Sequence, residues 1–272
     1  MKKVVVVPAV ALLLLSLLTV SAFPFSFGTH LYIAKNVNNN PGVFLNYQNM
    51  YGSMAPDLCY TAPLALWTAL ETATHEYPGY LKVKYAALTS AQKAFARGWI
   101  THNAYNGADY YAHRVSPITG YPPGYVPEKA AQLIAAGAPP ALAAIYVEVA
   151  IDLLLENNQD RLLGHEIVLS AYFRDWTIPH LLVKAYPEFD PNVLKSAESA
   201  FRYFSILYGR TLALPTPYDK YRFADGIALL GFAMGTFVTR DQSRAYLQGA
   251  IKLCEGDYAD AISETIKKIA GP

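Results

Sequence analysis

One short segment carries histidine and carboxylate side chains at helical spacing. Residues 101–113 read THNAYNGADYYAH, and on a single helix the ligand-type side chains fall at i, i+4, i+7 and i+11 on one face: His102, Asn106, Asp109 and His113. The flanking residues are mostly apolar or small, so we expect this face to be buried rather than solvated. Buried His and Asp side chains are unfavourable unless they are paired or bound to metal. Two imidazoles and a carboxylate on one buried face are ligands that zinc prefers, and we predict a metal site.

Further candidate ligands lie within or beside apolar stretches elsewhere in the chain. They are His30 in GTHLYIAKNV, Asp57 in YGSMAPDL, His75 in LETATHEY, and Glu148 with Asp152 in AIYVEVAIDLLLE. Each residue alone is more often a satisfied structural residue, and the last two, at i and i+4, also suit an ordinary polar stripe. Their number and order favour one shared site.

Four of these segments resemble, in order, the bacterial zinc-dependent phospholipase C family, whose fold is shared with fungal single-strand-specific nucleases. THLYIAKNV is similar to the family's first His helix, and GSMAPDL to its Gly-Ser-x-Ala-Pro-Asp turn. GWITH followed by DYYAH resembles its central helix with two His and one Asp, and VEVAIDLLL resembles its later Glu helix. The resemblance ends at Asp152 and implies a single all-α domain.

The resemblance also implies a cluster of two or three zinc ions. Its ligands, carried over position by position, are Asp57, His75, His102 and Asp109 for one zinc, His30 with the shared Asp109 for a second, and His113 with Glu148 for a third. Closely spaced metals polarise phosphoryl oxygens and lower the pKa of bound water, which generates a hydroxide nucleophile. Asp57 is the candidate general base for that water.

The central helix departs from the family pattern. The family's His and Asp stand four residues apart, but here position 106 is Asn and the carboxylate comes seven residues after His102. Either an added helical turn moves Asp109 into the bridging role, or Asn106 fills that role with a neutral oxygen. We favour Asp109, because its spacing to His113 is that of the family.

The later helix departs as well. Ala144 stands where the family has a His, four residues before Glu148, so the third site lacks a ligand. Asp152, one turn beyond Glu148, could substitute for it. His165 or His180 could also approach from elsewhere in the fold.

The N-terminus predicts export. A positively charged start is followed by an apolar run over residues 4–20 and by small residues that suit signal peptidase. We predict a signal peptide over residues 1–22 and one domain over residues 23–272, with an uncleaved N-terminal anchor as the alternative. Cleavage would expose Phe23, whereas secreted members of the family use an N-terminal Trp as a metal ligand.

Composition and patterning favour one helical domain. Pro and Gly punctuate segments with helical apolar spacing, and no sustained period-two alternation is present. The expected helices cover approximately residues 29–37, 63–75, 90–113, 128–136, 140–156, 164–173, 179–185, 191–207, 221–237 and 243–270, with a Pro-rich exposed loop over residues 116–127. The only two cysteines, Cys59 and Cys254, could form one disulfide or stay as free thiols.

These observations predict a zinc-dependent phosphoric ester hydrolase with phospholipid as the preferred substrate class. The tyrosines of residues 121–125 could contact acyl chains or a choline head group, which would bring the protein to a membrane surface. The net charge of +1 and the lack of a Lys/Arg run argue against binding of duplex nucleic acid. Two alternatives stay open: a single-strand nuclease, and an exported metal-binding protein with an incomplete, non-catalytic site.

Overall fold

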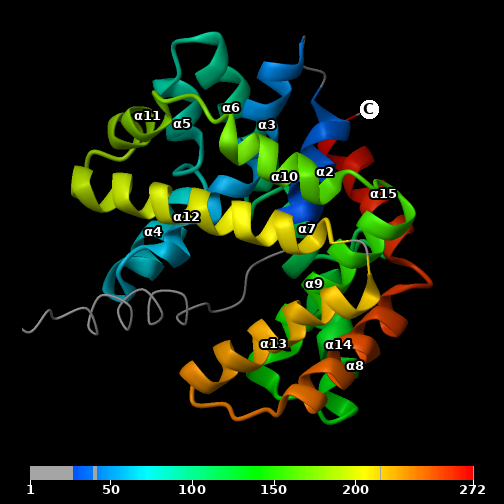
Figure 1. Cartoon of the computed structure of the whole chain (residues 1–272). Helices are drawn as coiled ribbons and strands as arrows, with labels where there is room; N and C mark the ends of the chain where they lie inside the picture. Colours follow the sequence, from blue (N-terminus) through cyan, green and yellow to red (C-terminus); the bar gives the residue numbers. More distant parts are fainter. Residues whose placement is uncertain (1–26, 39–41, 215, 272) are drawn as a thin grey trace, which may run out of the picture.

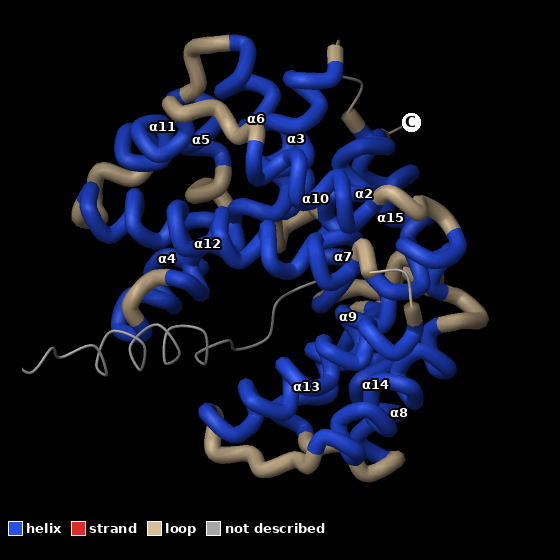
Figure 2. The backbone as a smooth tube through the Cα atoms, viewed as in Figure 1, coloured by secondary structure: helices blue, strands red, loops and turns tan. Residues whose placement is uncertain are grey.

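The computed structural model describes residues 27–38, 42–214 and 216–271, and the predicted signal peptide lies outside this part of the chain. The described residues form helices and turns without a strand, in one domain, which confirms the all-α prediction (Figures 1 and 2). The elements are α2 (Phe27–Val37), α3 (Val43–Met54), η1 (Ala55–Thr61), η2 (Leu64–Leu66), α4 (Trp67–His75), α5 (Leu81–Ala86), α6 (Ser90–His102), α7 (Ala108–His113), α8 (Tyr125–Ala135), α9 (Pro140–Asn158), α10 (Leu163–Tyr172), α11 (Ile178–Ala185), α12 (Pro191–Leu212), α13 (Pro217–Ala233), α14 (Arg240–Cys254) and α15 (Tyr258–Ala270).

The helices pack as two groups that share α9. In the view of Figure 1, the upper group holds α2 to α6 and α10 to α12, and the lower group holds α8, α13 and α14 around α9. Helix α2 packs against both α3 and α9, and α15 packs against α2 and α7. The segments that carry candidate ligands, α2, η1, α4, α6, α7 and α9, therefore meet where the two groups join.

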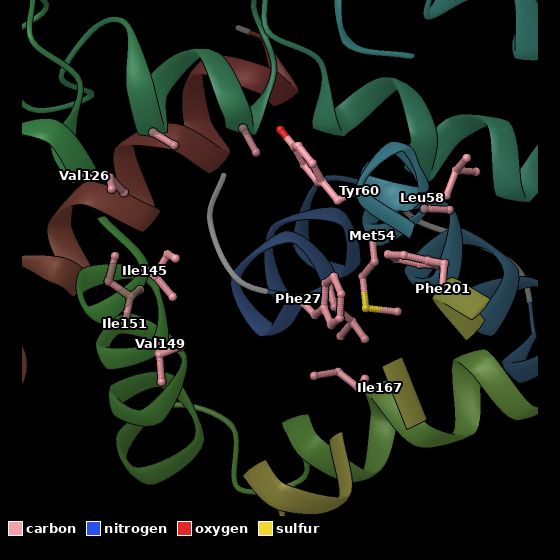
Figure 3. Close-up of a cluster of buried hydrophobic side chains, with 14 of the residues drawn as sticks. Phe27, Met54, Leu58, Tyr60, Val126, Ile145, Val149, Ile151, Ile167 and Phe201 are labelled. Atoms are coloured by element: carbon pink, nitrogen blue, oxygen red, sulfur yellow. The ribbon is translucent and has the colours of Figure 1, made fainter. Parts of the chain in front are cut away.

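Helix α9 is the centre of the core. It begins at Pro140, where proline is tolerated because the first-turn amides have no helical partner, and residues 145–156 are all buried. Figure 3 shows its side chains Ile145 and Ile151 in the apolar interior, and Phe27 of α2 beside Phe201 of α12. Glu148 and Asp152 are buried within this apolar helix, which requires that each be satisfied by a partner.

Two glycines allow α3 and α6 to approach closely. A Cβ atom on Gly98 would lie 1.9 Å from the carbonyl oxygen of Asn49, and one on Gly52 would lie 2.1 Å from that of Phe95. No other residue type fits at these positions without separating the helices. These are the glycines of the GWITH and GSMAPDL segments, so their role is to bring the end of α6 against α3.

The expected continuous helix over residues 90–113 is wrong. Helix α6 ends at His102 and α7 begins at Ala108, with a turn between them. The side chain of Asn103 causes the break, because its Oδ1 accepts hydrogen bonds from the backbone N–H groups of Tyr105 and Asn106 at 2.8 and 2.9 Å. Such local side-chain bonds compete with the helix.

Other boundaries also differ from expectation. The helical run over residues 43–61 and the short helix α5 were not expected, and the segment 243–270 is two helices, α14 and α15. The expected loop ends earlier than residue 127, because Pro127 lies in the first turn of α8, where proline lacks no needed donor. Tyr125 is buried there, so the predicted contact of residues 121–125 with lipid cannot involve its ring.

The two cysteines are separate thiols. Cys59 lies in η1 and Cys254 at the end of α14, and both are buried and free. The structure therefore selects free thiols over the disulfide. None of the helices in the described part of the chain combines the length and apolar character needed to span a bilayer.

Candidate metal centre

Four candidate ligands from four elements converge in the interior, and we call them the inner group: His30 of α2, Asp57 of η1, His75 of α4 and His102 of α6. The Nε2 atoms of His75 and His102 lie 3.0 Å apart, and they lie 3.4 and 3.5 Å from Asp57 Oδ1. The His30 ring stacks on the His102 ring with centroids 3.9 Å apart. All four side chains are at most 3% exposed, so the inner group lies in the protein interior.

Backbone carbonyl groups orient two of these imidazoles. His102 Nδ1 donates to the carbonyl oxygen of Ser53 at 2.8 Å, and His75 Nδ1 lies 3.2 Å from that of Glu71 and 2.8 Å from Thr74 Oγ1. A carbonyl only accepts, so Nδ1 of His102 carries the proton and Nε2 of the neutral ring carries a lone pair, which faces His75 Nε2 in this structure. This is the arrangement that fixes metal-ligating histidines, with the second nitrogen held by a backbone oxygen.

Burial and mutual contacts shift the pKa values of the inner-group side chains. Burial raises the pKa of Asp57 to about 7, against the lowering effect of its contact with His75. Burial and the neighbouring His30 and His75 rings hold the pKa of His102 well below its usual range, so this ring stays neutral. For His75, burial lowers the pKa, but contact with Asp57 and the charge of Asp109 outweigh it and raise the pKa. A neutral His102 imidazole and an Asp57 carboxyl group that can lose its proton near pH 7 are together suitable ligands for a divalent cation.

Three further ligands form an outer group: Asp109 and His113 of α7 and Glu148 of α9. His113 Nε2 lies 3.8 Å from Asp109 Oδ1 and 3.5 Å from Glu148 Oε1. The His113 side chain is 24% exposed and the Glu148 side chain 1%, so the group reaches from the core towards solvent. Burial raises the pKa of Glu148 well above its usual range, and the charges of Asp57 and Asp109 add to this effect.

Several carboxylate oxygens of the two groups are buried without a hydrogen-bond partner among the described residues. They are Asp57 Oδ2, Asp109 Oδ1 and both oxygens of Glu148. A buried carboxylate in this state is strongly unfavourable unless it is protonated or bound to a cation. One ligand atom from each of His30, Asp57 and His102 lies within 4.8 Å of the others, so this trio could hold a metal ion. Imidazole nitrogens and carboxylate oxygens are zinc ligands, so the residues present fit the implied metal.

Asp152 lies apart from both groups in its contacts. Its Oδ1 accepts hydrogen bonds from the backbone N–H and the hydroxyl group of Thr29, and its Oδ2 accepts from the N–H of Gly28 and the hydroxyl of Tyr208, all at 2.7 to 2.8 Å. Both oxygens are therefore occupied within the protein. The carboxylate binds the first amides of α2 and thereby positions His30.

The other alternative ligands also lie elsewhere. Asn106 has an exposed side chain in the turn between α6 and α7, whereas Asp109 is buried beside His113, so the carboxylate is the better placed of the two. His165 and His180 are exposed on α10 and α11. Neither belongs to the inner or the outer group in this structure.

Sequence reasoning did not find the groups that orient the ligands. The carbonyls of Ser53 and Glu71 belong to the backbone, and no side-chain pattern marks them. The hydroxyl of Tyr208 comes from α12, beyond the part of the chain that carries the resemblance. The only available signal was the pair Gly52 and Gly98, which brings the Ser53 carbonyl to His102.

Comparison with known protein families, with curated proteins and with solved structures gave no significant match.

Proposed function

We propose that this protein is a zinc-dependent phosphoric ester hydrolase with phospholipase C-type chemistry, exported from the cell. The observation that carries the proposal is the convergence of seven His, Asp and Glu side chains from six elements, four of whose buried carboxylate oxygens have no hydrogen-bond partner among the described residues. A purely structural role would leave these groups poorly satisfied. The order of the ligand segments adds support through the resemblance to zinc-dependent phospholipases.

At such a site, some residues would bind zinc and Asp57 would also act as the general base. His30, Asp57, His75, His102 and Asp109 would hold two zinc ions, with a third at the outer group. Bound zinc would polarise the phosphoryl oxygens and lower the pKa of a water molecule. Asp57, whose Oδ2 has no hydrogen-bond partner among the described residues, would serve as the general base.

Substrate would enter on the side of His113, the most exposed member of the two groups. Arg114 follows it directly and is half exposed, in an ion pair with Glu76, which in turn follows His75. Exposed ion pairs contribute little free energy, so the Arg114 guanidinium can leave the Glu76 carboxylate and bind a substrate phosphate instead. Arg114 is therefore the proposed phosphate-orienting residue.

Exposed aromatic rings near the same loops support a phospholipid substrate. Tyr77 and Tyr105 are 62% and 59% exposed, and their ring centroids are 5.5 Å apart. The turn that carries Tyr105 is tied to the end of α4 by a hydrogen bond from the N–H of Ala104 to the carbonyl of His75. The pair could bind a choline group by cation–π contact and rest on a lipid surface.

The experiment is hydrolysis by the purified protein after removal of metal and reconstitution with zinc. Phosphatidylcholine vesicles and single-stranded DNA are offered separately, each with and without EDTA. We expect zinc-dependent release of phosphocholine that EDTA abolishes. Faster cleavage of the DNA would assign the site to a single-strand nuclease, and no chelator-sensitive cleavage of either substrate would defeat the proposal.

A non-catalytic metal-binding protein is the second candidate, and the outer group is the observation that favours it. Asp109, His113 and Glu148 supply three ligands, and Ala144 offers none. Metal analysis by mass spectrometry separates the two functions. A catalytic cluster requires at least two tightly bound ions per chain, whereas a degenerate site retains one or none.

A further inference from the structure

A pocket lies beside α6 and is not lined by His102. This pocket, of about 510 Å³, opens between the C-terminal ends of α2, α5 and α15, one side of α6 from Lys93 to Thr101, and the turn between α6 and α7. Its size is in the range of small-molecule sites. None of the seven ligand-type side chains of the inner and outer groups lines it. The pocket is therefore separate from the metal centre.

Its lining is strongly basic. Four cationic side chains line it, and no carboxylate side chain does: Lys84, Lys93, Arg97 and Lys268. The whole chain has a net charge of only +1, so this is a local concentration of positive charge. Such a concentration within a concave site attracts anions.

The pocket lysines differ from other lysines of the chain in their partners. Neither Lys84 nor Lys93 makes an ion pair with a described residue. In contrast, Lys82 pairs with Glu188 and Lys267 pairs with Glu264, each at 2.6 Å, although each lies within two residues of a pocket lysine. Lys84 and Lys93 thus remain available to an external anion.

Helix electrostatics explain only part of this arrangement. Lys84 and Lys268 lie in or near the last turns of α5 and α15, where positive charge is favourable. Lys93 and Arg97 instead lie within α6 at i and i+4, where like charges repel and destabilise the helix. An anion bound between them would offset this repulsion, in addition to any contacts that Arg97 makes elsewhere.

The remaining lining indicates what kind of anion fits. The amide of Asn106, exposed at the turn, adds hydrogen-bonding groups, and Ile100 and Ile269 supply an apolar wall. From these features the geometry points to a binding site for a small organic phosphate, held by Lys84, Lys93, Arg97 and Lys268. Clustering of the cations in one pocket, rather than along a groove, favours a single phosphate-bearing group over a nucleic-acid strand.

The test is calorimetric titration of the whole chain with inorganic pyrophosphate and with glycerol 3-phosphate. The protein is first treated with EDTA and dialysed, so that binding cannot come from metal ions and the outcome is independent of the proposed hydrolase activity. We expect one ligand per chain, with affinity that falls as salt rises. Vesicles that contain phosphatidic acid form a third arm, and binding to them in place of the soluble probes would place the phosphate on a lipid.

Matched variants locate the binding. The double variant Lys84→Gln with Lys93→Gln should weaken binding by about tenfold or more, because two charge-assisted hydrogen bonds are lost. The control is Lys82→Gln with Lys267→Gln, which removes the same charge from α5 and α15 outside the pocket and should leave affinity within about twofold. Equal weakening in both double variants, or no binding in any of the three arms, would overturn the site.

Discussion

His102 Nδ1 donates a hydrogen bond to the carbonyl oxygen of Ser53 at 2.8 Å, and this contact aims Nε2 of the ring at Asp57. The contact joins the end of α6 to the end of α3, and it forms because Gly52 and Gly98 let the two helices approach. A backbone packing feature thus sets the direction of a candidate metal ligand. The geometry of the inner group depends on this helix pair before it depends on any metal.

The first prediction concerns that helix pair. Gly98→Ala should destabilise the protein by at least about 2 kcal/mol, because the added methyl group overlaps the carbonyl oxygen of Asn49 and forces α3 and α6 apart. It should also reduce zinc affinity, since the Ser53 carbonyl moves away from His102. Thermal unfolding and zinc titration measure the two effects.

The control for this substitution is Gly226→Ala. Gly226 lies within α13, and nothing lies within 4 Å of the position its Cβ would take. Alanine there should leave stability unchanged or raise it by up to about 1 kcal/mol, because glycine is the poorer helix former. Equal stability of the two variants would contradict the role of the α3–α6 approach.

The second prediction concerns the inner group itself. Asp57→Asn removes a buried carboxylate that contacts both His75 and His102, so we expect loss of at least one zinc ion per chain and a fall in hydrolysis of about 100-fold or more. Metal content by mass spectrometry and phosphatidylcholine hydrolysis measure these effects. His165→Asn, at an exposed position on α10, is the control and should leave metal content unchanged. Full metal content in Asp57→Asn would remove Asp57 from the site.

Helical spacing in the sequence predicted the fold class and most of the long helices correctly. It placed the ends of α9 and α11 within two residues, because an apolar run bounded by proline marks both helices. Helix α3, by contrast, reads VFLNYQNMYGSM, in which buried Gln48 and Asn49 interrupt the apolar pattern. Gln48 binds the carbonyl of Phe173 and Asn49 that of Ala34, so tertiary contacts satisfy side chains that look exposed in the sequence.

The candidate site was predicted less completely than the fold. Residue types and order pointed to the residues that form the inner and outer groups, but the reason given for the central segment was wrong. His102 and Asp109 do not share a helix face, since the Asn103 side chain ends α6, and tertiary packing sets their positions instead. The Asp152 carboxylate accepts hydrogen bonds from Thr29 and Tyr208, which are each more than 50 residues away in the sequence. Local spacing in the sequence cannot predict such contacts.

The third prediction is a pH dependence of stability in metal-free protein. Burial raises the pKa of Glu148 well above its unfolded value, so the folded state keeps a proton that the unfolded state has lost. The contribution of neutral Glu148 to the free energy of unfolding is fully present below the unfolded pKa of about 4.3. It is lost as the pH rises towards the folded pKa, and the free energy of unfolding falls by up to about 1.4 kcal/mol per pH unit. Glu148→Gln removes this loss, so its stability relative to the parent protein should increase from pH 5 to pH 8.

Denaturant unfolding of EDTA-treated protein at several pH values measures that trend. Glu264→Gln is the control, because contact with Lys267 lowers the pKa of this exposed carboxyl and gives a dependence of the opposite sign. Its stability relative to the parent should therefore not rise with pH. A flat difference between Glu148→Gln and the parent would show that Glu148 is not buried as a neutral acid.

The fourth prediction separates a structural Asp152 from a metal-binding one. Its oxygens accept hydrogen bonds from Gly28 and Thr29 at the start of α2, and from Tyr208 of α12. Asp152→Asn turns one acceptor into a donor that faces other donors, so stability should fall by about 3 kcal/mol or more while zinc content at low temperature stays unchanged. A double-mutant cycle with Tyr208→Phe should show coupling of about 1 kcal/mol or more, because the two side chains share a hydrogen bond. Loss of a zinc ion in Asp152→Asn without loss of stability would instead make Asp152 a ligand, and would supply the donor that Ala144 lacks.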